Sequence, residues 1–228
     1  MPNPALLAAP EGFELARIES QPFGENTYVL SRAESRECVV IDPGFEPGLV
    51  VEWLEFRGLQ PAAILLTHGH SDHIAGNAAL RARWPGLPIL ISRVDAPKLT
   101  DPGGNLSAAF GMAIKSPPAD RLLDDGAVIE AAGLRIVARS LPGHSSGHMV
   151  FLLDRVEPPV VFGGDVLFRG SIGRTDFPDG DFETLARGIR QNLYTLSDET
   201  IVHPGHGDPT TVGREKRTNP HVPAGRPD

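Results

Sequence analysis

The chain has 228 residues, of which 40% are hydrophobic and 22% are charged, so its composition is that of an ordinary soluble globular protein. It has no apolar run of about 18 residues and a single cysteine, Cys38, which excludes a membrane-spanning helix and an intrachain disulfide. The net charge of −8 disfavours a nucleic-acid partner. The first residues lack the basic and apolar segments of a signal peptide, so we expect a cytoplasmic location and no membrane partner.

Short apolar runs alternate with helical patterns along the chain. We predict strands at residues 13–18, 27–30, 37–41, 62–66, 88–91, 127–130, 134–140, 149–153, 160–162 and 200–203. We predict helices at residues 46–57, 75–83 and 182 to about 194, the first ended by Gly58 and the last capped by Asp181. Residues 101–120 show no periodicity, which is typical of a loop that covers a site. This order indicates an α+β fold built from two halves.

A dense group of potential metal ligands follows the apolar run at residues 62–66. It contains His68, His70, Asp72 and His73 within six residues. Neutral imidazole and carboxylate groups suit Zn²⁺, Mn²⁺ or Fe²⁺, and the lack of thiolates disfavours a structural zinc knuckle. If the strand geometry continues, the His68 and His70 side chains point to the same side. This spacing favours a metal site over a solvated polar turn.

Three further strand ends carry residues of the same kind. His144, Asp165 and His206 each follow a predicted strand, and glycines flank each of them. Glycine permits a sharp turn and leaves space beside the backbone. Alone, each residue could simply belong to a polar turn. Together with the first group, they predict that several strand ends converge on one metal site.

The complete pattern resembles the metal signature of the metallo-β-lactamase superfamily. The longer strings are similar to its glyoxalase II branch, and they are Leu65-Leu66-Thr67-His68-Gly69-His70, Pro142-Gly143-His144, Gly147-His148, Gly173-Arg174-Thr175-Asp176-Phe177 and Pro204-Gly205-His206-Gly207. The resemblance covers roughly residues 13–220. It implies an αββα sandwich with the metal site at one edge of the two sheets.

The resemblance also implies two divalent metal ions for each chain, zinc foremost, with iron or manganese as alternatives. The residues implied to bind the first ion are His68, His70 and His144, and those implied to bind the second are Asp72, His73 and His206. Asp165 would bridge both ions. Asp72 and Asp165 are expected to be the catalytic carboxylates, acting with a metal-bound hydroxide that attacks a carbonyl group.

The leading interpretation is a thioester hydrolase similar to glyoxalase II, which acts on S-lactoylglutathione, with a small-molecule thioester as its partner. Typical members carry a helical C-terminal domain that binds glutathione, and the 22 residues after His206 are too few for one. We therefore expect a single domain over residues 1–228, with a core at about 13–212 and a tail at 213–228, like the short bacterial members. Lys115 and Arg174 are weak candidates for substrate contacts.

Two alternatives remain open. A persulfide dioxygenase of this fold uses one iron bound by two histidines and an aspartate, here His70 or His68 with His144 and Asp165. Another hydrolase of the superfamily is the second alternative, because one site serves many substrates. A true β-lactamase is less expected, since the best-known dizinc lactamases have a cysteine where Asp165 stands. A binding module would have lost ligands, and all seven are present.

Overall fold

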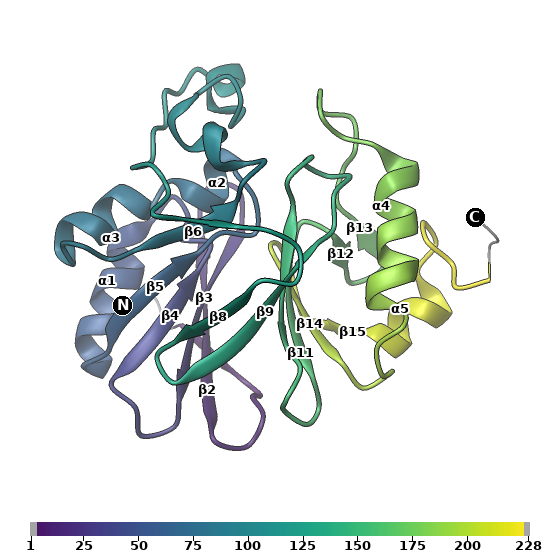
Figure 1. Cartoon of the computed structure of the whole chain (residues 1–228), viewed down its shortest axis with the longest axis horizontal. Helices are drawn as coiled ribbons and strands as arrows, with labels where there is room; N and C mark the ends of the chain where they lie inside the picture. Colours follow the sequence, from purple (N-terminus) through teal and green to yellow (C-terminus); the bar gives the residue numbers. More distant parts are fainter. Residues whose placement is uncertain (1–3, 226–228) are drawn as a thin grey trace.

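The computed structural model describes residues 4–225 and consists of two β-sheets packed face to face, with helices on both outer surfaces (Figure 1). The first sheet has seven strands in sequential order, and they are β1 (Ala5–Leu7), β2 (Phe13–Ser20), β3 (Glu25–Arg32), β4 (Glu37–Ile41), β5 (Gln60–Leu65), β6 (Ile89–Ser92) and β7 (Arg121–Leu123). Strands β1 to β4 are antiparallel, and β4 to β7 are parallel.

The second sheet has six strands in the order β15-β14-β11-β10-β9-β8. They are β8 (Val128–Ala131), β9 (Leu134–Ser140), β10 (Met149–Leu153), β11 (Val160–Gly164), β14 (Ile201–Pro204) and β15 (Thr210–Thr211). A separate two-stranded ribbon joins β12 (Leu167–Phe168) to β13 (Ser171–Ile172). This arrangement is the αββα sandwich that the resemblance implies.

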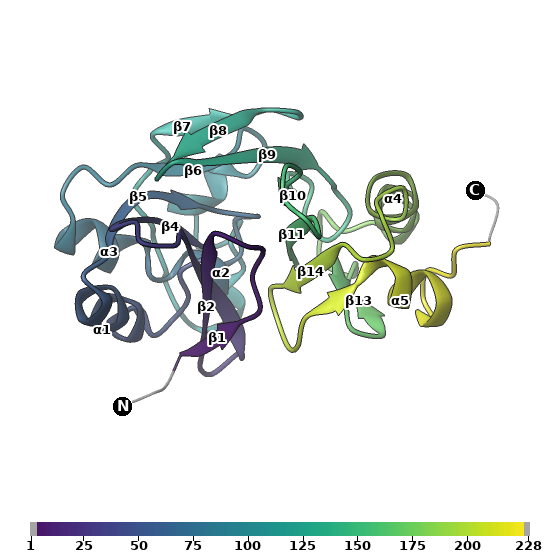
Figure 2. The same ribbon diagram turned by 90° about the horizontal axis from the view of Figure 1, so that it is seen from below.

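Helices cover the outer face of each sheet, as the view from below shows (Figure 2). The first sheet carries α1 (Pro47–Arg57), α2 (Ser71–Ile74) and α3 (Asn77–Arg83), followed by the 3₁₀ turns η1 (Ala96–Thr100) and η2 (Ser107–Phe110). The second sheet carries α4 (Phe182–Gly188), its π-helical continuation η3 (Ile189–Leu193) and α5 (Val212–Thr218). None of the helices in residues 4–225 is long and apolar enough to cross a membrane.

The period-two alternation of strand side chains produces a three-layered core. Val39 and Ile41 of β4 pack between the two sheets, whereas Val40 packs beneath α1 against Leu54. A third apolar cluster lies between the second sheet and α4. Cys38 is fully buried in the outer layer of the first sheet. Both sheets are thus buried on two faces, which fixes their strand ends relative to one another.

Two helix boundaries agree with the sequence predictions. Helix α1 ends at Gly58, whose φ of 65° is the left-handed conformation that glycine adopts readily. Asp181 caps α4, because its Oδ1 accepts a hydrogen bond of 2.7 Å from the backbone N–H of Thr184. The helix predicted at 75–83 instead begins at Asn77. Gly76 interrupts it, since its N–H bonds to the carbonyl of Pro43 and a Cβ there would meet backbone at 2.9 Å.

The predicted core boundary at 212 is wrong. Residues 213–222 continue the fold, because α5 begins at Val212 and both Val212 and Val222 are buried against α4 and the second sheet. The sequence pattern missed this helix because its seven residues carry mostly charged side chains. At the other end, β1 extends the first sheet ahead of residue 13.

Candidate metal centre

The predicted ligands all converge at one edge of the sandwich, where strands of both sheets end. His68 follows β5, while His144, Asp165 and His206 follow β9, β11 and β14. The first sheet therefore supplies one side of the site, and the second sheet supplies the other. The residues lie on turns held by rigid strands, which is the usual way that a fold positions reactive groups.

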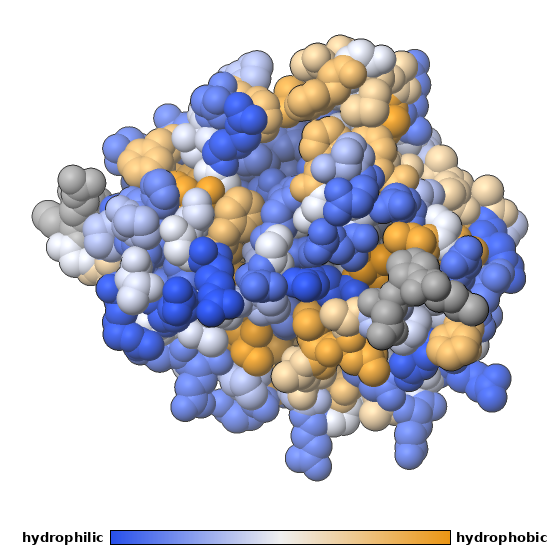
Figure 3. Space-filling model, turned by 180° about the vertical axis from the view of Figure 1, so that it is seen from behind, coloured by the Kyte–Doolittle hydropathy of each residue, from blue (hydrophilic) through white to orange (hydrophobic). Residues whose placement is uncertain are grey.

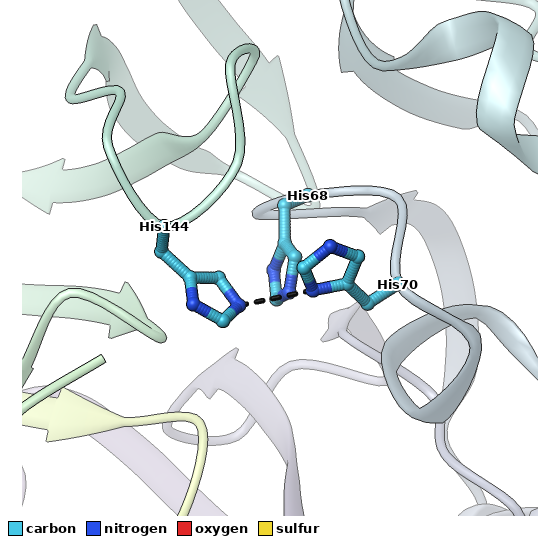
Figure 4. Close-up of side chains that lie close together, drawn as sticks. All are labelled: His68, His70 and His144. Carbon is cyan, nitrogen blue, oxygen red and sulfur yellow. Dashed lines mark hydrogen bonds between the residues drawn. The ribbon is translucent and has the colours of Figure 1, made fainter. Parts of the chain in front are cut away.

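The first ligand group consists of His68, His70 and His144, whose potential ligand atoms lie within 4.8 Å of one another. Their rings point toward a common centre (Figure 4). Nδ1 of His70 lies 2.9 Å from Nε2 of His144. Burial, reinforced by the neighbouring His144, lowers the pKa of His70 to about 3. Burial also holds the pKa of His68 well below its ordinary value. Both rings are therefore neutral, which is the form that binds metal.

The second ligand group consists of Asp72, His73 and His206, again within 4.8 Å. Oδ2 of Asp72 lies 3.3 Å from Nε2 of His206 and 3.8 Å from Nε2 of His73. Burial alone would lower the pKa of His206, but Asp165 and Asp72 outweigh it and raise this pKa to about 10. In the absence of a metal ion, this group is therefore an ionised network rather than a neutral one.

Asp165 lies between the two groups. Its Oδ1 is 3.4 Å from Nε2 of His73, and its Oδ2 is 3.5 Å from Nε2 of both His144 and His206. Burial would raise the pKa of Asp165, but His73 and His206 hold it well below the usual range. Gly205 leaves room for this carboxylate, since a Cβ there would lie 2.2 Å from Oδ1. One carboxylate thus faces both groups, as a bridging ligand would.

The donor atoms fit two divalent ions. Nε2 of His68, Nε2 of His73 and Oδ1 of Asp165 are buried, and none has a hydrogen-bond partner within residues 4–225. Buried polar atoms without partners are rare in folded proteins and call for an unseen ligand. Imidazole nitrogens and carboxylate oxygens are the donors that Zn²⁺, Mn²⁺ and Fe²⁺ prefer. The seven residues could therefore hold a dinuclear metal site.

Asp42 orients ligands of both groups, a role that sequence reasoning missed. Its carboxylate accepts hydrogen bonds from the backbone N–H of Thr67 at 2.8 Å and from the Thr67 hydroxyl at 2.6 Å, and it lies 3.1 Å from Nδ1 of His73. The Thr67 hydroxyl lies 3.0 Å from Nδ1 of His68. Such outer partners fix the orientation of a ligand ring. In the sequence, Asp42 signals only a turn before Pro43.

Asp95, just before η1, connects the two ligand loops. Its carboxylate accepts the backbone N–H of Gly69 at 2.9 Å and that of Gly147 at 3.0 Å. It also accepts the Ser145 hydroxyl and pairs with Lys98 at 3.0 Å. Gly69 lies between His68 and His70, and Ser145 follows His144. This buried carboxylate therefore holds the first ligand group together across the two sheets, and no local sequence signal marks it.

Two other histidines take structural positions. Nε2 of His148 accepts a hydrogen bond of 3.1 Å from the backbone N–H of Asp165, and its ring stacks on His68 with centroids 4.7 Å apart. His203 is buried between Tyr28 and Phe162, with ring centroids 5.4 Å apart in both cases. His148 thus supports the bridging carboxylate, and His203 belongs to the core.

A cavity of about 260 Å³ opens beside the ligands, and it is lined by His70, Ser71, Asp72, His144 and Asp165 together with Phe23, Asn105, Leu106, Phe110, Arg174 and Phe177. The loop predicted at 101–120 therefore does border the site. Arg174, a candidate for substrate contact, lines the cavity, but Lys115 does not. Its neighbour Ser116 is anchored inward by a 2.9 Å hydrogen bond from Asn77, which leaves the Lys115 side chain exposed.

Comparisons with known proteins show the family to which this chain belongs. The family model of the metallo-beta-lactamase superfamily matches residues 21–206. The hydroxyacylglutathione hydrolase GloC of Haemophilus influenzae is 38% identical over 195 residues, covering 83% of this chain and 89% of the relative.

Two solved structures are similar along most of their length. The BLEG-1 B3 metallo-beta-lactamase superposes with a TM-score of 0.86 at 36% identity, covering 91% of this chain and 99% of that one. TTHA1623, solved in a di-iron-bound form, has a TM-score of 0.79 at 41% identity, and the match covers 90% of this chain and 98% of that one. The matched range includes all seven ligand residues and ends at His206. This chain belongs to the metallo-beta-lactamase superfamily.

Proposed function

We propose that this metal-dependent hydrolase cleaves thioesters of small acids and that two divalent ions occupy its ligand groups. The observation that carries the proposal is the position of Asp165 between the two groups: its Oδ1 faces the second group, and its Oδ2 faces both groups. The 38% identity to a hydroxyacylglutathione hydrolase supports a thioester as the substrate. Zinc, iron and manganese all suit these donors.

When bound, such ions polarise a carbonyl group and lower the pKa of bound water. The chain's own residues supply the remaining requirements. Asp72 lines the cavity, and its side chain is 19% exposed, so it is placed to accept a proton from water in the cavity. Asp72 and Asp165 supply two negative charges, fewer than the positive charges that two divalent ions would bring, so the loaded site would favour a negatively charged transition state.

A cysteine-based mechanism does not fit this chain. Cys38 is fully buried in the outer layer of the first sheet, and burial raises the pKa of its thiol to about 12. It is therefore protonated and out of reach of any substrate in the cavity. Attack by water, with the proton accepted by a carboxylate, is the route that the arrangement supports.

The assembled second ligand group argues against the persulfide dioxygenase. That chemistry needs one iron with open coordination positions. Here Asp72, His73 and His206 lie within 4.8 Å of one another beside the first group. This arrangement favours a second ion and therefore hydrolysis.

The test is to load the purified protein separately with zinc, iron and manganese, to count bound ions by mass spectrometry, and to measure thiol release from S-lactoylglutathione and from S-acetyl thioesters. We expect thiol release that requires two ions for each chain. The chelated protein and Asp165→Ala serve as controls. Protein that holds two ions and releases no thiol from any thioester would overturn the proposal. Oxygen consumption with a persulfide by a one-iron form would favour the dioxygenase.

A further inference from the structure

The cavity beside the ligands has an aromatic surface assembled from distant parts of the chain. Phe23, Phe110 and Phe177 all line it. The Phe23 ring centroid lies 5.5 Å from that of Phe110 and 5.4 Å from that of Phe45. Phe110 remains 54% exposed, so part of its ring is open to contact with a ligand. Only the folded chain brings these rings together.

The aromatic surface reaches the first ligand group directly. The Phe177 ring lies edge-on to His70, with centroids 5.3 Å apart, and 6.1 Å from His144. A substrate whose carbonyl group lies at the ligands would therefore contact Phe177 with the atoms next to that carbonyl. Figure 3 shows apolar side chains gathered on the lobe at the upper right, beside a hollow lined by hydrophilic residues. This lobe is the one that rises above α2 in Figure 1.

The basic side chains near the cavity already have carboxylate partners. Arg174 makes two hydrogen bonds of 2.7 Å to Asp176, and its guanidinium carbon lies 4.2 Å from the centroid of the Phe177 ring. Lys98 bonds to Asp179 at 2.6 Å. Among the described residues that line the cavity, Arg174 is the only lysine or arginine. A ligand carboxylate in the cavity would therefore have to share Arg174 with Asp176.

These observations separate two kinds of substrate. Glutathione carries carboxylates and an ammonium group, whose desolvation needs compensating partners. An aromatic ring needs only apolar surface, and moving one from water into such a cavity favours binding by about tenfold to a hundredfold. The cavity offers the second kind of contact and little of the first.

We propose that Phe23, Phe110 and Phe177 form a subsite for an aromatic or similarly apolar group attached next to the thioester, and that thioesters with such a group are preferred over S-lactoylglutathione. This inference rests on the proposed thioester hydrolysis. It assigns the substrate selectivity of this site to its aromatic surface.

The test compares three thioesters on the fully loaded enzyme. S-lactoylglutathione is compared with the lactoyl thioester of benzyl mercaptan and with S-mandeloylglutathione, each rate being divided by that of hydroxide hydrolysis. We expect at least one aromatic substrate to exceed S-lactoylglutathione about tenfold in kcat/KM. A preference for S-lactoylglutathione over both would overturn the proposal. The two aromatic substrates also show whether the ring belongs on the thiol or on the acyl side.

Substitutions test whether the aromatic surface causes this substrate preference. Phe110→Ala should lower the advantage of the aromatic substrate over S-lactoylglutathione about tenfold, mainly through KM. Phe56→Ala is the matched control, because Phe56 lies on α1 and is 78% exposed. An advantage that survives both Phe110→Ala and Phe23→Ala would also overturn the subsite.

A binding measurement separates this inference from the proposed function. (Benzylthio)acetone keeps the ring, the sulfur and the carbonyl group but has no thioester bond. Calorimetry should show that it binds the loaded wild type about tenfold more tightly than (methylthio)acetone does, and that Phe110→Ala removes the difference. If no thioester is cleaved but this difference is present, thioester hydrolysis fails and the subsite stands. If thioesters are cleaved, neither aromatic thioester is preferred and the difference is absent, the subsite fails alone.

Discussion

The two ligand groups differ in charge, burial and origin. The first is made of three buried imidazoles, two from the first sheet and one from the second. The second contains a carboxylate, and both Asp72 and His206 remain partly exposed. Without metal, burial keeps His68 and His70 of the first group neutral, while Asp165 and Asp72 keep His206 protonated. An ion can therefore bind His68 and His70 without displacing a proton from them, whereas an ion at the second group must displace the protons held by His73 and His206.

This difference predicts an order of affinity that depends on pH. Protons compete with metal ions only where the free ligands hold protons. The second group should therefore lose its ion first as the pH falls, and the first group should keep its ion longest. Asp165 connects the two groups, so its removal should weaken metal binding at both of them.

The largest effect is expected from Asp165→Ala, because this residue faces both groups. Metal content should fall below one ion for each chain. Loss of carbonyl polarisation costs several kcal/mol of transition-state stabilisation, which corresponds to a decrease of about a thousandfold or more in kcat/KM. Metal analysis and thiol release measure the two results. A variant that retains two ions would show that Asp165 is not the bridge.

His144→Ala and His206→Ala separate the two groups. His206→Ala should retain one ion at the buried first group, whereas His144→Ala should weaken that group. We expect each to lower kcat/KM by more than the roughly 10–100-fold typical of an outer partner. His221→Ala, near the end of the described chain, is the control and should leave metal content and activity unchanged. Equal metal loss in both ligand variants would contradict the independence of the groups.

Asp95→Asn tests the connection between the loops of the first group. The asparagine amide has the same shape as the aspartate carboxylate, but one of its two oxygens is replaced by an NH₂ group. This NH₂ group would face another donor, the backbone N–H of either Gly69 or Gly147. We expect a decrease of about 10–100-fold in metal affinity or activity. A chromogenic chelator measures the affinity by competition. Asp124→Asn is the control, since this exposed carboxylate pairs with Arg93 on the surface. An unchanged first site in Asp95→Asn would remove its positioning role.

The protons held by the second group should also affect the stability of the chelated protein, which can be measured. The pKa of His206 is raised from 6.5 to about 10 in the folded chain, so the folded state binds more protons than the unfolded state between these values. Its stabilising contribution is complete below pH 6.5 and is lost as the pH rises toward 10. Urea unfolding of the chelated protein should therefore show a falling free energy of unfolding across this range.

His206→Ala provides the comparison for that measurement. The chelated variant lacks the titrating ring and should show a shallower decrease over the same range. The loaded wild type should also lack this decrease, because bound ions replace the protons. Parallel profiles for the chelated wild type and the variant would show that His206 is not held protonated by its neighbours.

The ligands could be predicted from the sequence because their pattern is mostly local. His68, His70, Asp72 and His73 lie within six residues, and the other ligands follow apolar strands next to glycines. The resemblance also implied the layered sandwich, and the apolar runs at β4 and β5 supplied its core. Short elements such as β7 and α5 carry too few apolar residues to give a periodic signal.

The supporting residues could not be predicted, because tertiary structure alone defines their partners. Asp42 bonds to Thr67, 25 positions away, and Asp95 bonds to Gly147, 52 positions away. Nothing in their sequence neighbourhood distinguishes them from ordinary turn or surface aspartates. The same holds for the aromatic surface, since Phe23, Phe110 and Phe177 come from separate segments. The position of Lys115 outside the cavity depends on how residues 101–120 fold, which the sequence does not show either.

The smallest effect is therefore expected from Lys115→Ala. This side chain is exposed, and it does not line the cavity beside the ligand groups. The substitution should change the free energy of unfolding by less than about 0.5 kcal/mol, as is usual for such surface positions. Because the charge lies outside the cavity, kcat/KM for S-lactoylglutathione should stay within about twofold of the wild type. A decrease of tenfold or more, confined to KM, would show that the loop moves Lys115 onto the substrate. The Lys115 ammonium group would then lie in the cavity, whereas the present arrangement of residues 101–120 keeps it outside.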